Sequence, residues 1–99
     1  MYAVRIAAGA EKELGELRAF DRVRIVEAIE TQLTHRPAVE TRRRKPLRAA
    51  VWPWVTAGPV WQLRVGELRV FYDIDEAEQV VIVQAVRRKP SHRTTKEIM

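Results

Sequence analysis

Two arginines interrupt a segment that otherwise has the pattern of a buried β-hairpin, WQLRVGELRVFYD at residues 61–73. Apolar residues alternate with polar ones on both sides of Gly66-Glu67, which predicts two strands joined by a two-residue turn. In that register Arg64 lies directly opposite Arg69, on the face away from the apolar side chains. Like charges opposed across strands are destabilising. We therefore expect a nearby carboxylate, solvation or an anionic ligand to offset the repulsion.

Phosphate is an anionic ligand well suited to arginine, because a guanidinium stays charged and donates paired hydrogen bonds. The carboxylates of Glu67 and Asp73 offer an alternative partner, but the basic flanks favour phosphate. Further basic side chains could grip a nucleic-acid backbone, which adds salt-dependent affinity without sequence choice, or could form an ordinary solvated surface. They fall in two clusters: Arg87, Arg88 and Lys89, and Arg42, Arg43, Arg44 and Lys45.

Composition predicts one folded domain over residues 1–99, with 46% hydrophobic and 31% charged residues. The net charge of +5 makes a polyanion a candidate partner, although many basic proteins bind none. The absence of cysteine excludes disulfides, thiolate metal sites and a cysteine nucleophile. With only His35 and His92, no histidine metal site is expected either. We expect no signal peptide and no membrane span, and we expect a cytoplasmic location.

The N-terminal half predicts a short strand followed by two helices. Alternation over residues 2–7 indicates the strand, and Leu14 and Leu17 lie on one stripe of a short helix over residues 10–19. Asp21 is expected to cap the second helix, and Pro37 to end it. The apolar positions of that helix are Val26, Ile29 and Leu33, with Ile25 beside them.

The C-terminal half predicts strands. A basic loop over residues 42–45 leads to an edge strand near residues 51–56, in which Pro53 allows only an edge position. The hairpin follows, and then an acidic turn at residues 75–78. The nearly continuous apolar run at residues 80–86 indicates an internal strand. A short helix could begin at Thr95.

The element order β-α-α-β-β-β-β predicts an α+β fold, in which an N-terminal strand and a helical hairpin precede a mainly antiparallel sheet packed on the helices. The opposite face of the sheet should carry Arg64, Arg69 and part of the 87–89 cluster. We expect Tyr72 and Trp61 to pack in the core. Trp52 and Trp54 share one face of the edge strand, so one of them could contact a partner.

The segments KPL, WQLRVGELRVFYDID and VVIVQAVRRK together resemble the RelE/ParE superfamily of toxins from bacterial type II toxin–antitoxin pairs. The resemblance covers nearly the whole chain and implies a RelE-like fold. It also implies a cognate acidic antitoxin as partner. RelE-like members cleave messenger RNA in the ribosomal decoding site, whereas ParE-like members poison DNA gyrase.

Some functional residues of the superfamily have counterparts in this sequence, and others do not. Arg69 matches an arginine that stabilises the transition-state phosphate in RelE-like nucleases. Arg88 and Lys89 fall where a second catalytic arginine lies. The two catalytic lysines correspond to Val60 and Gln62, and the C-terminal tyrosine has no counterpart, because Thr94 and Thr95 occupy that region.

Cleavage of RNA by its own 2′-hydroxyl needs a positioned strand, proton transfer and a stabilised phosphate, and in principle no metal or other cofactor. His92 is the best acid–base candidate, because histidine titrates near pH ~6.5. Lys89 could serve if its neighbours depress its pKa. An exposed tail histidine and an ordinary exposed lysine are the alternatives.

The leading hypothesis is therefore translation inhibition by a metal-independent, ribosome-dependent endoribonuclease. Its expected catalytic residues are Arg69, Arg88, Lys89 and His92, and its expected RNA-binding residues are Arg64, Arg87, Arg42, Arg43, Arg44 and Lys45. The alternatives are a gyrase inhibitor that cleaves nothing and a degenerate toxin that acts only through protein contacts. The missing lysines and tyrosine favour these alternatives.

Overall fold

The structure is a computed structural model that describes residues 1–47, 54, 56 and 58–89. One strand and two helices precede four further strands along the chain. The elements are β1 (Ala3–Ile6), α1 (Ala8–Glu16), α2 (Ala19–Leu33), β2 (Arg44–Pro46), β3 (Trp61–Val65), β4 (Leu68–Asp75) and β5 (Val80–Arg88).

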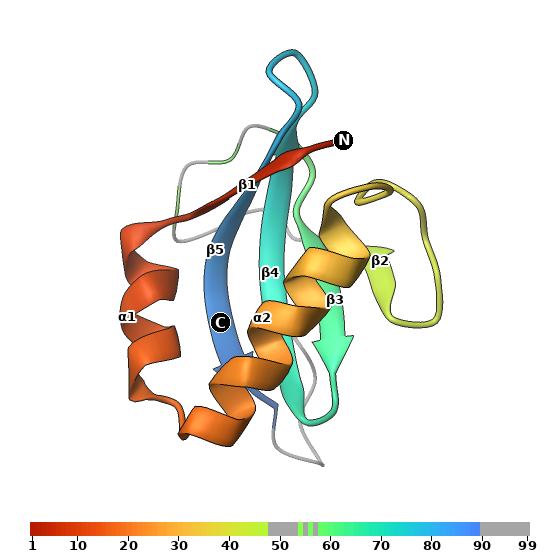
Figure 1. The fold of residues 1–99 in the computed structure, drawn as a ribbon. Coiled ribbons are helices and arrows are strands. Elements are labelled where there is room, and N and C mark those ends of the chain that lie inside the picture. The colour runs from red at the N-terminus through yellow and green to blue at the C-terminus, as the bar shows by residue number, and fades with distance from the viewer. Residues whose placement is uncertain (48–53, 55, 57, 90–99) are drawn as a thin grey trace.

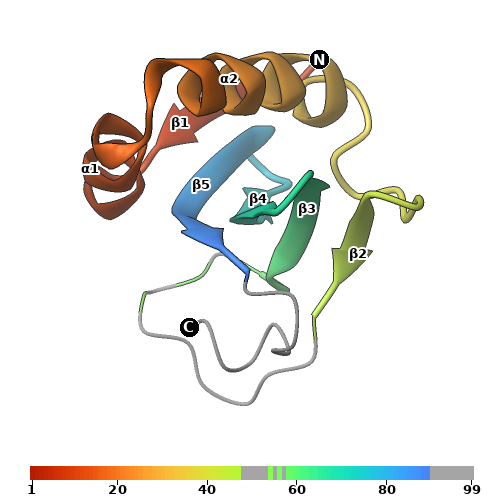
Figure 2. The ribbon, with the colours of Figure 1, turned by 90° about the horizontal axis from the view of Figure 1, so that it is seen from below.

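The five strands form one sheet in the order β1-β5-β4-β3-β2. Only β1 and β5 run parallel, and the other neighbours are antiparallel. Figures 1 and 2 show α2 lying across one face of this sheet and α1 at the side of the sheet, next to β5. The predicted α+β class, with a mainly antiparallel sheet packed on the helices, is confirmed. The predicted internal strand is β5, which lies between β1 and β4.

The main core fills the space between the helices and the sheet. Ile25, Ile29 and Leu33 of α2 recur every four residues and are buried against the sheet, where Tyr72 is also fully buried. Val26 was expected among them, but it is 42% exposed. One residue of helix turns the side chain by about 100°, so the stripe that contains Ile25 leaves Val26 facing solvent.

The helix boundaries differ from the predicted ones. Helix α1 begins and ends earlier than residues 10–19, and α2 already begins at Ala19. Asp21 therefore lies within the first turn of α2 and is not its cap; Arg18 holds the cap position and makes no side-chain capping bond. Helix α2 ends at Leu33, four residues before Pro37.

Part of the predicted basic loop is a strand. Arg44–Pro46 forms β2, the edge strand next to β3, and a proline is tolerated there because the outer edge needs no ladder donor. Arg44 is buried, and its guanidinium donates to the carbonyl oxygen of Gln32 near the end of α2. The edge strand predicted at residues 51–56 falls mainly outside the described residues, and the helix predicted from Thr95 falls wholly outside them.

Candidate functional site

The hairpin of β3 and β4 has the predicted register. Val65 pairs with Leu68 and Arg64 with Arg69, across the turn at Gly66. Gly66 has φ +59°, which suits the first central position of a tight hairpin turn. A Cβ atom at Gly66 would also overlap Nη2 of Arg24 on α2, so the backbone conformation favours glycine there and any side chain would displace the end of the Arg24 side chain.

A third arginine extends this pair across the sheet. Arg69 pairs with Arg87 on β5, so Arg64, Arg69 and Arg87 form a row over three adjacent strands. We call these three residues the arginine row. It lies on the sheet face away from α2, because its members alternate with residues of the core beneath α2, such as Leu68 and Val86.

A β-bulge decides which basic residues of β5 share this face. The β4–β5 register shifts between Phe71 and Tyr72, which pair with Ala85 and Val83 and leave Gln84 as the extra residue. Val83 and Val86 consequently both face the helices. Arg87 joins the arginine row, as expected for part of the 87–89 cluster, whereas Arg88 pairs with Leu68 and lies on the helix-covered side.

Among the described residues, Arg69 is held by neutral groups only. Its Nη1 donates to the carbonyl oxygens of Gly66 at 2.9 Å and Leu68 at 3.0 Å. Its Nε is buried without a hydrogen-bond partner in the described part of the chain. Burial and the nearby charge of Arg64 lower the pKa of the Arg69 guanidinium.

In the described part of the chain, neither Glu67 nor Asp73, the carboxylates considered from the sequence, neutralises the opposed charges of Arg64 and Arg69. Within the described ranges no carboxylate forms an ion pair with either arginine. Glu67 pairs instead with Arg88, and Asp73 accepts a hydrogen bond from Gln84. Arg64 is exposed, so water solvates its charge. The two arginines therefore concentrate positive charge at the turn end of the hairpin.

Arg87 differs from the other two members of the row because it has a carboxylate partner. Glu13 of α1 accepts hydrogen bonds from Arg87 Nε and from the Val86 backbone N–H, the latter at 3.0 Å. One carboxylate thus satisfies an edge donor of β5 and neutralises part of one end of the row.

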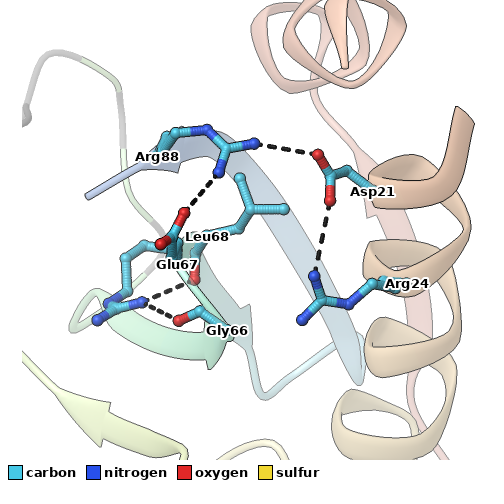
Figure 3. Close-up of polar contacts among 7 residues, drawn as sticks. Asp21, Arg24, Gly66, Glu67, Leu68 and Arg88 are labelled. Carbon is cyan, nitrogen blue, oxygen red and sulfur yellow. Dashed lines mark hydrogen bonds and ion pairs between the residues drawn. The ribbon is translucent and has the colours of Figure 1, made fainter. Parts of the chain in front are cut away.

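Arg88 bridges two carboxylates on the helix side of the sheet. Its guanidinium lies 3.0 Å from Glu67 Oε2 and 3.0 Å from Asp21 Oδ2, as Figure 3 shows. The next residue, Lys89, donates its backbone N–H to the Glu67 carbonyl oxygen at 2.8 Å. Reading the sequence missed Asp21 and Glu13 as partners of arginines, because no local pattern links either helix to β5.

The basic segment before β3 approaches the hairpin from the side. Arg43 accepts a backbone hydrogen bond from Arg64 at 2.7 Å. Both residues border a groove of about 470 Å³ between α2 and β3, which Arg24 and Glu27 of α2 also line. Arg42, Arg43 and Lys45 are exposed, whereas Arg44 is buried against the helix end. Three of the four residues in this segment that were predicted to bind the nucleic-acid backbone are therefore accessible.

Other predicted features are placed only in part. His92 and Trp52 lie outside the described residues. Trp61 stacks on Tyr72 at 6.3 Å between ring centroids, and Trp54 packs against Phe71. In the described ranges no cluster of histidine, aspartate or glutamate could hold a metal ion, and no helix is long and apolar enough to cross a membrane.

Comparisons with solved structures place the fold among RelE proteins. A chain of the toxin–antitoxin complex RelBE2 from Mycobacterium tuberculosis is 26% identical, with a TM-score of 0.72 over 89% of this chain and 98% of that one. A chain of the archaeal RelE–RelB complex from Pyrococcus horikoshii is 22% identical, with a TM-score of 0.69 over 94% and 98%. The isolated E. coli RelE toxin is 18% identical, with a TM-score of 0.51 over 98% and 92%.

The family comparison covers most of the chain. No curated protein sequence matches it at significant similarity. Residues 4–89 match the family described as the ParE toxin of the type II toxin–antitoxin system parDE. This range includes β5 and all three members of the arginine row. The chain belongs to the ParE toxin family, within the RelE/ParE superfamily of type II toxin–antitoxin toxins.

Proposed function

We propose that this toxin inhibits translation by cleaving messenger RNA on the ribosome, with Arg69 stabilising the phosphate in the transition state. The observation that carries the proposal is the arginine row, in which Arg69 is bound to two carbonyl oxygens and to no carboxylate of the described chain. A cation that is already oriented and lacks a counter-ion favours a phosphate whose negative charge grows during reaction.

The remaining roles follow from position. Arg64 is exposed beside Arg69 and would hold the RNA backbone, with Arg87 at the other end of the row. Arg42, Arg43 and Lys45 would add contacts to more distant phosphates. The 2′-hydroxyl of the RNA would be the nucleophile, and Lys89 or His92 would transfer the proton.

Arg88 and Arg44 fit this scheme less well. The guanidinium of Arg88 reaches the phosphate only if it leaves Glu67 and Asp21. Arg44 reaches RNA only if it leaves the carbonyl of Gln32 at the end of α2. Both steps would leave buried or paired groups without partners, which is costly.

We also propose a cognate acidic antitoxin as partner. The related chains from M. tuberculosis and P. horikoshii are described in toxin–antitoxin complexes. An acidic segment could place carboxylates beside Arg64 and Arg69 and so satisfy the charge that the hairpin leaves uncompensated.

Cleavage on programmed ribosomes tests the leading proposal. The wild type should cut message inside the decoding site and leave free RNA intact, and Arg69→Ala should lose at least about 100-fold in rate, since removing one such donor typically costs that much. Arg36→Ala is the matched control, because Arg36 is an exposed arginine in the loop after α2. Intact message at saturating wild-type protein would refute the nuclease.

A gyrase poison is the second candidate, favoured by one specific observation. Val60 and Gln62 stand where the resemblance places catalytic lysines, and they are only 1% and 5% exposed. Neither side chain could replace a lysine at a reacting phosphate. Under this alternative the protein would inhibit supercoiling by DNA gyrase and leave message uncut, so the two assays together separate the candidates.

A further inference from the structure

Three successive backbone carbonyl oxygens at the turn between β3 and β4 each accept a hydrogen bond. Arg69 Nη1 donates to the first and the third, those of Gly66 and Leu68. The Lys89 backbone N–H donates to the middle one, that of Glu67. The direction of the Arg69 guanidinium therefore depends on where this turn lies relative to β5.

Side chains fix the turn to the helix layer as well. Glu67 extends from the turn to Arg88, and Arg88 continues to Asp21 in the first turn of α2 (Figure 3). Asp21 is only 6% exposed and also faces Arg24 at 3.6 Å. Arg24 in turn lies against Gly66, where a Cβ atom would overlap it. We call Asp21, Glu67 and Arg88 the turn anchor.

Charge distinguishes Arg88 from Arg69. Arg88 sits between two carboxylates, so a phosphate would have to displace at least one of them, and the Asp21 carboxylate is nearly buried. Arg69 is bound to uncharged carbonyls on the opposite face of the sheet. Of these two arginines, only Arg69 offers its charge to an anion without breaking an ion pair.

We propose that Arg88 is a positioning residue: through Glu67 and Asp21 it fixes the β3–β4 turn, whose carbonyl oxygens aim Arg69. The inference rests on the proposed function in one respect, since Arg69 is taken to contact the phosphate. An error of about 1 Å in a group at the reacting centre can cost on the order of 100-fold in rate, so a weak, partly exposed anchor can matter for rate while contributing little stability.

Removing the anchor's negative charges separates this role from direct phosphate contact. Asp21→Asn and Glu67→Gln each remove one of the two carboxylates that hold Arg88, and each raises the net charge by one. If Arg88 binds phosphate, both changes should leave cleavage unchanged or increase it. If Arg88 positions Arg69, cleavage on the ribosome should fall, by roughly tenfold for Asp21→Asn and a few-fold for Glu67→Gln, in kcat and not through a higher KM.

Glu30→Gln is the matched control, because Glu30 is an exposed carboxylate of α2 that forms no ion pair with any described residue. It makes the same change in charge and should leave kcat unchanged. Asp21→Asn could lower stability because Asp21 is buried; Glu67→Gln then carries the test, since the Glu67 side chain is 79% exposed. An unchanged or higher kcat for Glu67→Gln would overturn the proposal.

Nuclear magnetic resonance of the Arg69 guanidinium gives a readout that does not require cleavage. In the wild-type chain the two carbonyl bonds should slow rotation and solvent exchange of the Nη1 hydrogens. Glu67→Gln and Arg88→Ala should average these signals, and Glu30→Gln should not. Unchanged signals in both anchor variants would refute positioning, whereas absence of cleavage by the wild type would refute only the proposed nuclease.

Discussion

At the scale of single residues, the arginine row combines three cations in three different environments. Arg64 is exposed, and Arg87 is paired with Glu13. Arg69 is half-buried and donates hydrogen bonds to backbone carbonyl oxygens. The three guanidinium groups therefore differ in how accessible their charge is and in what they bind. Burial and the charge of Arg64 lower the pKa of Arg69, but a guanidinium titrates so far above neutrality that it remains charged at physiological pH.

Lysine substitutions test the importance of the guanidinium itself. Arg69→Lys keeps a positive charge but loses the planar group that can bind two carbonyls and a phosphate together. We expect it to cleave message at least about tenfold more slowly than the wild type, while Arg64→Lys loses only a few-fold because charge alone suffices to hold backbone. Rates on programmed ribosomes measure both. Equal rates for Arg69→Lys and the wild type would contradict a bidentate role.

At the scale of elements, the β3–β4 turn joins the hairpin, β5 and α2. Its geometry depends on Gly66, whose positive φ disfavours a side chain and at which a Cβ atom would displace the end of the Arg24 side chain. The other glycine that allows a comparison is Gly15 in α1, where a Cβ would meet nothing within 4 Å. These two glycines should respond oppositely to alanine.

Gly66→Ala should lower the free energy of unfolding by about 1–2 kcal/mol, because an L-residue is strained at that φ and its Cβ displaces Arg24. Gly15→Ala should raise it by about 0.5–1 kcal/mol, because alanine is the better helix former. Urea denaturation of the two variants measures the difference. A Gly66→Ala protein as stable as the wild type would mean that the turn can move away from α2.

At the scale of the whole molecule, Tyr72 connects the sheet to the segment after α2. Its ring is fully buried, stacks near Trp61, and its hydroxyl donates to the Pro37 carbonyl at 2.7 Å. Burial raises the pKa of the Tyr72 hydroxyl well above its usual value of about 10, although Arg44 acts in the opposite direction. The folded protein therefore holds this proton more tightly than the unfolded chain.

Stability should consequently fall as the pH rises above about 10, because ionisation of this tyrosine then stabilises only the unfolded state. The contribution approaches about 1.4 kcal/mol for each pH unit. In Tyr72→Phe this part of the slope should vanish, while the lost hydrogen bond lowers stability at every pH. Denaturation of both proteins from pH 8 to 11 gives the difference between their free energies of unfolding. The contributions of the other titrating groups cancel in this difference. Parallel curves would contradict the raised pKa.

The sequence by itself determined the local features. The register of β3 and β4, and with it the opposition of Arg64 and Arg69, follows from alternation on two sides of Gly66-Glu67. Helical spacing predicted Ile29 and Leu33 of the buried stripe of α2 correctly but wrongly included Val26, and the order of elements predicted the α+β class. Each depends on interactions between residues close in sequence, which periodicity and turn chemistry report directly.

Only the tertiary structure decided which basic residues act together. The bulge at Gln84 shifts the alternation of β5 by one residue, so Arg87 joins the row and Arg88 turns to the helices. A one-residue shift reverses every later side chain of a strand, and nothing local marks where a bulge falls. The partners Glu13 and Asp21 lie 74 and 67 residues from the arginines that they bind. Ion pairs across such separations depend on packing, and the sequence pattern carries no record of them.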